Sequence, residues 1–166
     1  MNMMAIDPGN KFSAYVVMDM ETYKPIMFEK IPNDDLIEKI RHITVSFVVA
    51  VFVIERVENF GMAVGREVFD TCEWIGRFSQ EIMHTCGTYP DYVFRNEEKQ
   101  VICHSNKAKD TNIRRALIDR FAKHDLKNGK GTQSNRDFFY GFAKDVWAAF
   151  AVGYTWLRIK GYVKEE

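Results

Sequence analysis

The chain begins with an apolar run that stops at a turn, since residues 3–10 read Met-Met-Ala-Ile-Asp-Pro-Gly-Asn. The four apolar residues predict a short buried strand. The turn after it is predicted because proline fixes φ and glycine permits a positive φ. Two more runs of β-forming residues follow at 13–20 and 26–31, separated by turn-forming residues at 22–25. Residues 3–31 are therefore predicted to form three antiparallel strands.

The rest of the chain alternates between helical and strand patterns. A helix is predicted from Pro32 to about His42, and the segment from Thr44 to Ile54, with its apolar run, is typical of a strand buried on both faces. Apolar residues recur every three to four positions from Met62 to about Met83, which indicates a long amphipathic helix. Further elements are predicted as a strand at 100–104, helices at 108–122 and 138–159, and a mobile loop at 125–135.

This order predicts the α/β class: a mixed five-stranded sheet of three antiparallel strands and then parallel additions, flanked by helices. The 166 residues fit one domain spanning 1–166, and 46% hydrophobic with 28% charged residues argues against disorder. No secretion signal is recognisable, and the longest apolar run, 47–54, is far shorter than the roughly 20 residues of a membrane helix. We therefore expect a cytoplasmic protein that makes no membrane contact.

The chain has three cysteines, an odd number without the spacing of metal ligands. In a protein without a secretion signal they are expected to be reduced thiols. Cys72 and Cys103 are predicted to be small core residues, and no role is predicted for Cys86.

Acidic residues end two strong apolar runs. Asp7 follows the first predicted strand and Glu55 follows the fourth. If both strands are central and parallel, the two side chains emerge at the same sheet edge about 4.8 Å apart, where open α/β sheets bind their ligands. A third acid, Asp145, lies within the apolar segment 138–159, where an unpaired charge is costly to bury. Three converging carboxylates without clustered His or Cys suit Mg²⁺ or Mn²⁺.

Each of these acids also has a purely structural interpretation. Asp7 could serve the turn alone, and Glu55 could pair with Arg56 or lie at a solvated strand end. Asp145 could pair with Arg158 or Lys144, or could simply lie on an exposed stripe of its helix. Only their joint placement in one topology favours a metal site.

Seven segments carry a family resemblance in chain order. They are 6–10, 53–55, 61–65, 68–78, 108–114, 130–132 and 144–149. Together they resemble the RuvC-like Holliday junction resolvases of the ribonuclease H-like superfamily, most closely the short versions of phages and prophages of low-GC Gram-positive bacteria.

The resemblance implies a Mg²⁺-dependent endonuclease, with Mn²⁺ as a substitute, that resolves Holliday junctions and other branched DNA by paired phosphodiester hydrolysis. The catalytic and metal-binding acids would be Asp7, Glu55 and Asp145, holding two ions about 4 Å apart. The protein would be a homodimer joined through helix 64–82 and located in the host cytoplasm if a phage encodes it. On that helix Phe69, Trp74 and Phe78 are interface candidates, or alternatively face the monomer core.

One position departs from the family pattern. Many relatives carry a second acid or a histidine three residues before the last-helix aspartate, where this chain has Phe142. Asp137 is predicted to be the N-cap of that helix. Glu58, in the loop after Glu55, is a candidate for a group behind the ligands.

Basic residues are concentrated in segment 95–136, where eleven Lys and Arg against five Asp and Glu give +6 in a chain of zero net charge. Such a basic face suits phosphate contact, although it could also be an ordinary solvated helix face. Phe60 could stack on an unpaired base, or else pack against the long helix. The other candidates for DNA contact are Lys107, Lys109, Arg114, Lys130 and Lys144.

Three other functions remain open from the sequence. One is a nuclease of the same fold that acts on another nucleic acid, such as an RNA–DNA hybrid. Another is a junction-binding module without catalysis. The last is a sugar-kinase or actin-like ATPase domain, which ranks lowest because the chain is too short for the two lobes of such proteins.

Overall fold

A computed structural model describes residues 1–46 and 48–162 and shows a five-stranded mixed sheet in the order β3-β2-β1-β4-β5. β2 pairs antiparallel with β1 and β3, whereas β4 pairs parallel with β1 and β5. This confirms the predicted fold class. The strands are β1 (Asn2–Asp7), β2 (Phe12–Asp19), β3 (Pro25–Pro32), β4 (Val49–Arg56) and β5 (Asp91–Phe94).

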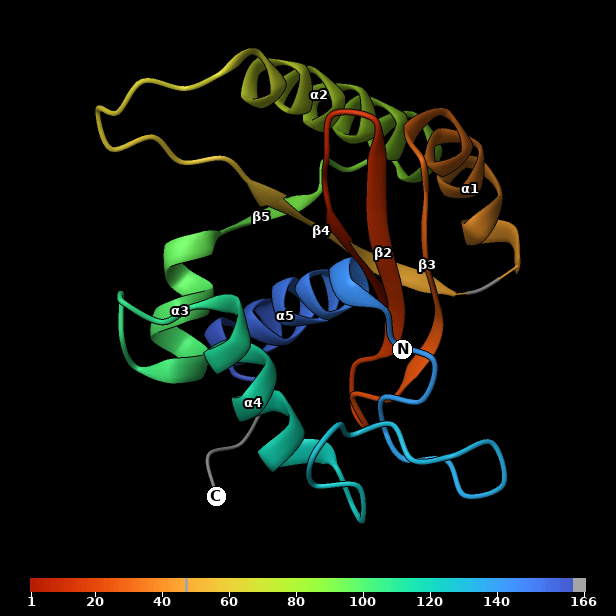
Figure 1. Ribbon diagram of the computed structural model, residues 1–166. Helices are drawn as coiled ribbons and strands as arrows, with labels where there is room; N and C mark the ends of the chain where they lie inside the picture. Colours follow the sequence, from red (N-terminus) through yellow and green to blue (C-terminus); the bar gives the residue numbers. More distant parts are fainter. Residues whose placement is uncertain (47, 163–166) are drawn as a thin grey trace.

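Helices cover both faces of the sheet (Figure 1). On one side lie α1 (Asn33–Ser46) and α2 (Arg66–Cys86). On the other lie α3 (Arg95–Cys103), α4 (Asp110–Phe121) and α5 (Lys144–Ile159). None of these helices is both long and apolar enough to cross a membrane, for the residues that the structure describes.

Two hydrophobic cores lie on opposite faces of the sheet because side chains alternate along each strand. In β1, Met3 belongs to the core under α5 and Met4 to the core under α1 and α2. The contact with α5 is close at Gly153, where a Cβ would come within 2.8 Å of Met18 Cε and 3.0 Å of Ala5 Cβ. The central strand is thus fixed from both sides.

The predicted strand at 100–104 is wrong. The fifth strand is β5, and residues 95–103 form α3. The apolar pair Val101 and Ile102 suggested a strand, but the helix is favoured locally because the Glu97 carboxylate accepts a hydrogen bond from the Phe94 amide at 2.8 Å, as in a capping box. The predicted strand 44–54 is also too long, since 44–46 belong to α1 and residue 47 lies outside the described residues.

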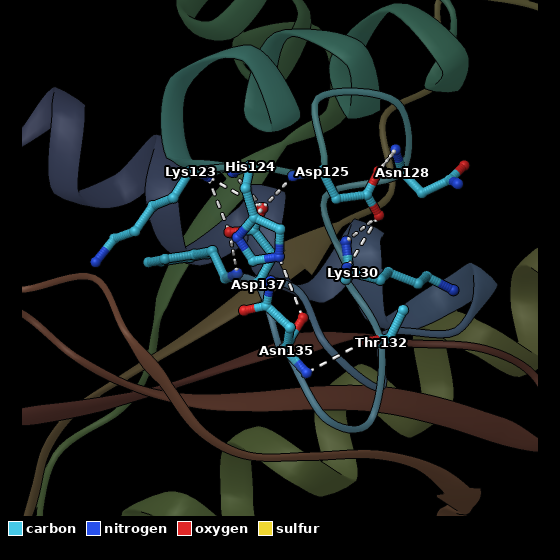
Figure 2. Close-up of polar contacts among 10 residues, drawn as sticks. Lys123, His124, Asp125, Asn128, Lys130, Thr132, Asn135 and Asp137 are labelled. Atoms are coloured by element: carbon cyan, nitrogen blue, oxygen red, sulfur yellow. Dashed lines mark hydrogen bonds and ion pairs between the residues drawn. The ribbon is translucent and has the colours of Figure 1, made fainter.

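The last helix begins at Lys144 rather than at residue 138. Gly141, with φ +85°, lies in the turn before it. Asp137 is therefore not its N-cap, and its carboxylate instead accepts hydrogen bonds from the backbone amides of Lys123, His124, Asp125 and Phe138 (Figure 2). Within the loop that was expected to be mobile, the Asp125 carboxylate accepts hydrogen bonds from the amides of Asn128, Lys130 and Gly131.

The three cysteines are free. Cys72 is exposed on α2, so its prediction as a core residue is wrong. Cys86 and Cys103 are partly buried and pack against the two hydrophobic cores.

Candidate metal and nucleic-acid site

The strand register brings Asp7 and Glu55 together. β1 and β4 are parallel neighbours in which Ile6 pairs with Ile54, so the next residue of each strand emerges at the same carboxyl edge. The two carboxyl groups are close enough for each to influence the pKa of the other. The sequence argument from two acids ending two apolar runs therefore placed this pair correctly.

The turn after Asp7 is tightly held. A Cβ on Gly9 would lie 2.2 Å from the Phe12 carbonyl oxygen, so this position requires glycine. The Gly9 amide donates to Ser13 Oγ at 3.1 Å, and Asn33 Nδ2 donates to the Gly9 carbonyl oxygen at 2.9 Å. Ser13 Oγ donates in turn to Asn33 Oδ1 at 2.6 Å. Buried polar residues thus fix the backbone that carries Asp7.

Asp145 lies in the first turn of α5 at the same site. It forms an ion pair with Lys30 of β3 instead of the Arg158 or Lys144 pairs considered from the sequence. Its negative charge raises the pKa of Asp7, which indicates that the two carboxylates are close enough to interact.

Burial and neighbouring charges shift the pKa values of the acid pair. The pKa of Asp7 lies well above its ordinary value, first because the group is desolvated and then because Glu55 is negative. Desolvation also raises the pKa of Glu55, while the positive charge of Arg95 lowers it. Such a crowded acidic pair in a cavity is typical of functional sites.

Three residues of this site were missed by the sequence analysis. Glu98 of α3 is fully buried and pairs with Arg95, whose guanidinium also pairs with Asp110 at the start of α4. The pKa of Glu98 is raised well above its usual value by burial and by the negative charges of Glu55 and Asp7. The false strand at 100–104 hid this group, because only a helix at 95–103 places residues 95 and 98 on one face.

A cavity of about 390 Å³ opens over the acids. Its walls combine the three predicted carboxylates with basic side chains. Arg114 lies over the Trp147 ring, 4.7 Å from its centroid. The lining residues are Asp7, Glu55, Arg95, Asp110, Thr111, Ile113, Arg114, Lys144, Asp145, Trp147 and Ala148.

Only two of the six predicted DNA contacts line this cavity, namely Arg114 and Lys144. Lys107 and Lys109 are exposed between α3 and α4. Lys130 is partly buried in the loop of Figure 2, where its amide donates to Asp125.

Phe60 does not pack against the long helix. It is 74% exposed in the loop between β4 and α2, which excludes that alternative. Glu58 is exposed in the same loop.

The three aromatic residues of α2 differ in burial. Phe78 is completely buried in the core under α1 and α2, and Trp74 is partly buried beside it with ring centroids 5.7 Å apart. Phe69 is 61% exposed. Of the three, Phe69 alone presents most of its surface to solvent.

The donor set fits a hard divalent cation, because all the converging acids offer carboxylate oxygens. Phe142 offers no ligand, since it is buried among aromatic rings and contacts Phe28 with centroids 4.6 Å apart. Within residues 1–46 and 48–162, no three Asp, Glu, His or Cys side chains are already drawn together as a preformed metal site. Two of the acids are instead paired with basic side chains: Asp145 with Lys30, and Glu98 with Arg95.

Comparison with known proteins identifies the fold. No protein-family model matches the sequence, and no curated protein matches it. The structure resembles Thermus thermophilus RuvC, with a TM-score of 0.70 and 11% identity over 97% of this chain and 96% of that one. It also resembles T. thermophilus RuvC in complex with Holliday junction substrate, with a TM-score of 0.69 and 12% identity over 96% of both chains. The chain thus has the RuvC-like form of the ribonuclease H-like fold.

Proposed function

We propose that the protein is a metal-dependent endonuclease that cleaves four-way DNA junctions and other branched DNA. One observation carries the proposal: Asp7, Glu55 and Asp145 meet at the carboxyl edge of the sheet inside a cavity with basic walls. The fold match adds support, since RuvC of this fold has been solved with a Holliday junction.

The three carboxylates would hold Mg²⁺, or Mn²⁺ in its place, as one or two ions. The metal would supply an activated water and stabilise the leaving oxygen of the phosphodiester. Asp7 interacts electrostatically with both Glu55 and Asp145, so it would help to hold the cation together with either of them. Lys30 holds Asp145 beside the strand ends.

The basic walls of the cavity suit the negatively charged sugar–phosphate backbone of DNA. Arg95, Arg114 and Lys144 surround the acids and would stabilise charge that develops on the phosphate. The Arg114 guanidinium is oriented by the Trp147 ring beneath it. Contacts of this kind to the phosphates would position the DNA without recognising its base sequence.

Four other candidates lie outside the cavity and would contact the arms of a branched substrate. They are Phe60, Lys107, Lys109 and Lys130. Phe60 has the exposure that stacking on an unpaired base requires.

Paired hydrolysis requires two active sites, which a homodimer would provide. The exposed side of α2, with Phe69 on it, is the surface proposed for this contact. The protein would act in the cytoplasm, in DNA recombination, repair or phage DNA processing.

The test uses labelled four-way junction, linear duplex and RNA–DNA hybrid, each with and without Mg²⁺. The expected result is a pair of symmetric nicks in the junction alone, dependent on metal. Cleavage of the RNA–DNA hybrid instead would support the proposed metal site but would mean that the substrate is not branched DNA. Junction binding without cleavage under any metal would overturn the nuclease and leave a binding module.

A further inference from the structure

Glu98 has an unusual environment for an acidic side chain. Its exposed fraction is 0%, although glutamate is rarely buried completely without full pairing. One oxygen, Oε2, accepts a hydrogen bond from Arg95 Nη1. The other, Oε1, has no hydrogen-bond partner among the described residues. An unpaired carboxylate oxygen in the interior is costly and calls for a ligand.

The carboxyl group of Glu98 faces the acid pair. It is close enough to Glu55 and to Asp7 for their charges to interact. Two carboxylates are both acceptors, so they approach each other only when a proton or a cation lies between them. The topology explains the contact, because β5 pairs with β4 at Glu55 and α3 begins directly after β5.

The local charges point to a divalent ion. When ionised, Asp7, Glu55 and Glu98 carry three negative charges, and Arg95 is the cation that opposes them directly. Asp145 is paired separately with Lys30. Arg95 also pairs with Asp110, so its single positive charge does not neutralise these three acids, and a divalent cation such as Mg²⁺ or Mn²⁺ would supply the missing positive charge.

We propose that Glu98 is a fourth carboxylate of the cation site, supplied by α3, and that its Oε1 binds the same cation as Glu55. This rests on the metal site of the proposed function and extends its ligand set. Phe142 is buried among aromatic rings and provides no ligand, and the additional carboxylate is supplied by α3 instead of α5.

The test is Mn²⁺ binding to the full chain without DNA, measured by isothermal titration calorimetry. Mn²⁺ is the probe because it takes the oxygen ligands that suit Mg²⁺. Glu98→Gln keeps the size of the side chain and an oxygen for Arg95 but removes the charge. Its Mn²⁺ affinity is expected to fall about 10- to 100-fold, the range measured when a group supporting a metal is lost.

Glu97→Gln is the matched control on the same helix. Glu97 accepts the Phe94 amide, and the glutamine oxygen preserves that role. Its Mn²⁺ affinity is expected to equal that of the wild type. A second measurement allows for a folding defect in the variant. The rise in Tm on adding Mn²⁺ is measured for the wild type and for Glu98→Asp, each against the same protein without Mn²⁺. Glu98→Asp keeps the negative charge, but its shorter side chain moves the carboxylate oxygens away from the site. The rise is expected to be smaller in Glu98→Asp.

The outcomes separate this inference from the proposed function. If Glu98→Gln binds Mn²⁺ as tightly as wild type while Asp7→Asn binds poorly, Glu98 only pairs with Arg95 and the inference is wrong. If the wild type shows no saturable Mn²⁺ binding, the metal site itself fails, and the proposed function fails with it.

Discussion

Two pairs of acidic residues in this chain have opposite surroundings. Asp125 and Asp137 lie in the loop between α4 and α5, where backbone amides donate to both carboxylates and lower both pKa values (Figure 2). Asp7 and Glu55 lie at the carboxyl ends of β1 and β4, where burial and neighbouring acids raise their pKa values.

Burial alone does not explain the difference. Asp137 is only 8% exposed, yet its pKa is far below the ordinary value because four backbone amides stabilise the anion. Asp7 and Glu55 have each other as partners instead. A carboxylate that accepts backbone hydrogen bonds stabilises the fold. Buried carboxylates that lie close together are less stable when ionised, and a bound cation would stabilise them.

The largest effect on folding is expected at the satisfied acid. Asp137→Ala removes the acceptor of the Lys123, His124 and Asp125 amides, so the free energy of unfolding should fall by about 3 kcal/mol. Urea unfolding measures it. Asp119→Ala, which removes an exposed ion pair, is the control and should lower the free energy of unfolding much less than Asp137→Ala does. Equal losses in the two variants would mean that the amide cluster contributes no special stability.

A smaller effect of opposite sign is expected at the crowded acid. The folded-state pKa of Asp7 is raised, so folding takes up protons and metal-free wild type loses stability as the pH rises between the unfolded and folded values. Asp7→Asn removes this cost. In EDTA it should be more stable than wild type at pH 8, with the advantage shrinking toward pH 4.

The same unfolding measurements over a range of pH also test the direction in which Asp137 changes the free energy of unfolding. The lowered pKa of Asp137 contributes stability that is present above its unfolded value and is lost as the pH falls toward the folded one. An Asp7→Asn variant that is less stable than wild type at every pH would contradict the contrast between the two acids.

The smallest effect is expected at the basic wall. Arg114 lines the cavity, whereas its neighbour Arg115 pairs with Asp119 and does not. Arg114→Gln should weaken junction binding several-fold and reduce the slope of log affinity against log salt by about 0.9, the value for one lost phosphate contact. Arg115→Gln should leave the slope close to that of wild type in a fluorescence-anisotropy titration. Equal slopes for wild type and Arg114→Gln would remove Arg114 from the DNA interface.

The sequence was sufficient wherever local pattern and topology agreed. Alternating apolar strands and the turn after Asp7 predicted β1 to β3, and two acids ending apolar runs predicted the neighbours Asp7 and Glu55. These features depend on the alternation of apolar residues and on the order of the strands along the chain, both of which can be read from the sequence.

Tertiary contacts decided the parts that the sequence did not predict. Val101 and Ile102 look like a strand but lie on a helix, so Glu98 was not recognised as part of the site. The Lys30 partner of Asp145 comes from β3, more than a hundred residues earlier. The role of Asp137 depends on amides of a separate turn, which no spacing rule connects to it.

Single-turnover cleavage of a labelled four-way junction by wild type and Asp7→Asn, at matched protein saturation and over a range of Mg²⁺, tests the central claim most directly. The account predicts metal-dependent paired nicks by the wild type and a rate at least about 10²-fold lower for Asp7→Asn, with junction binding retained. Equal cleavage by the two proteins, or cleavage by the wild type in EDTA, would contradict it.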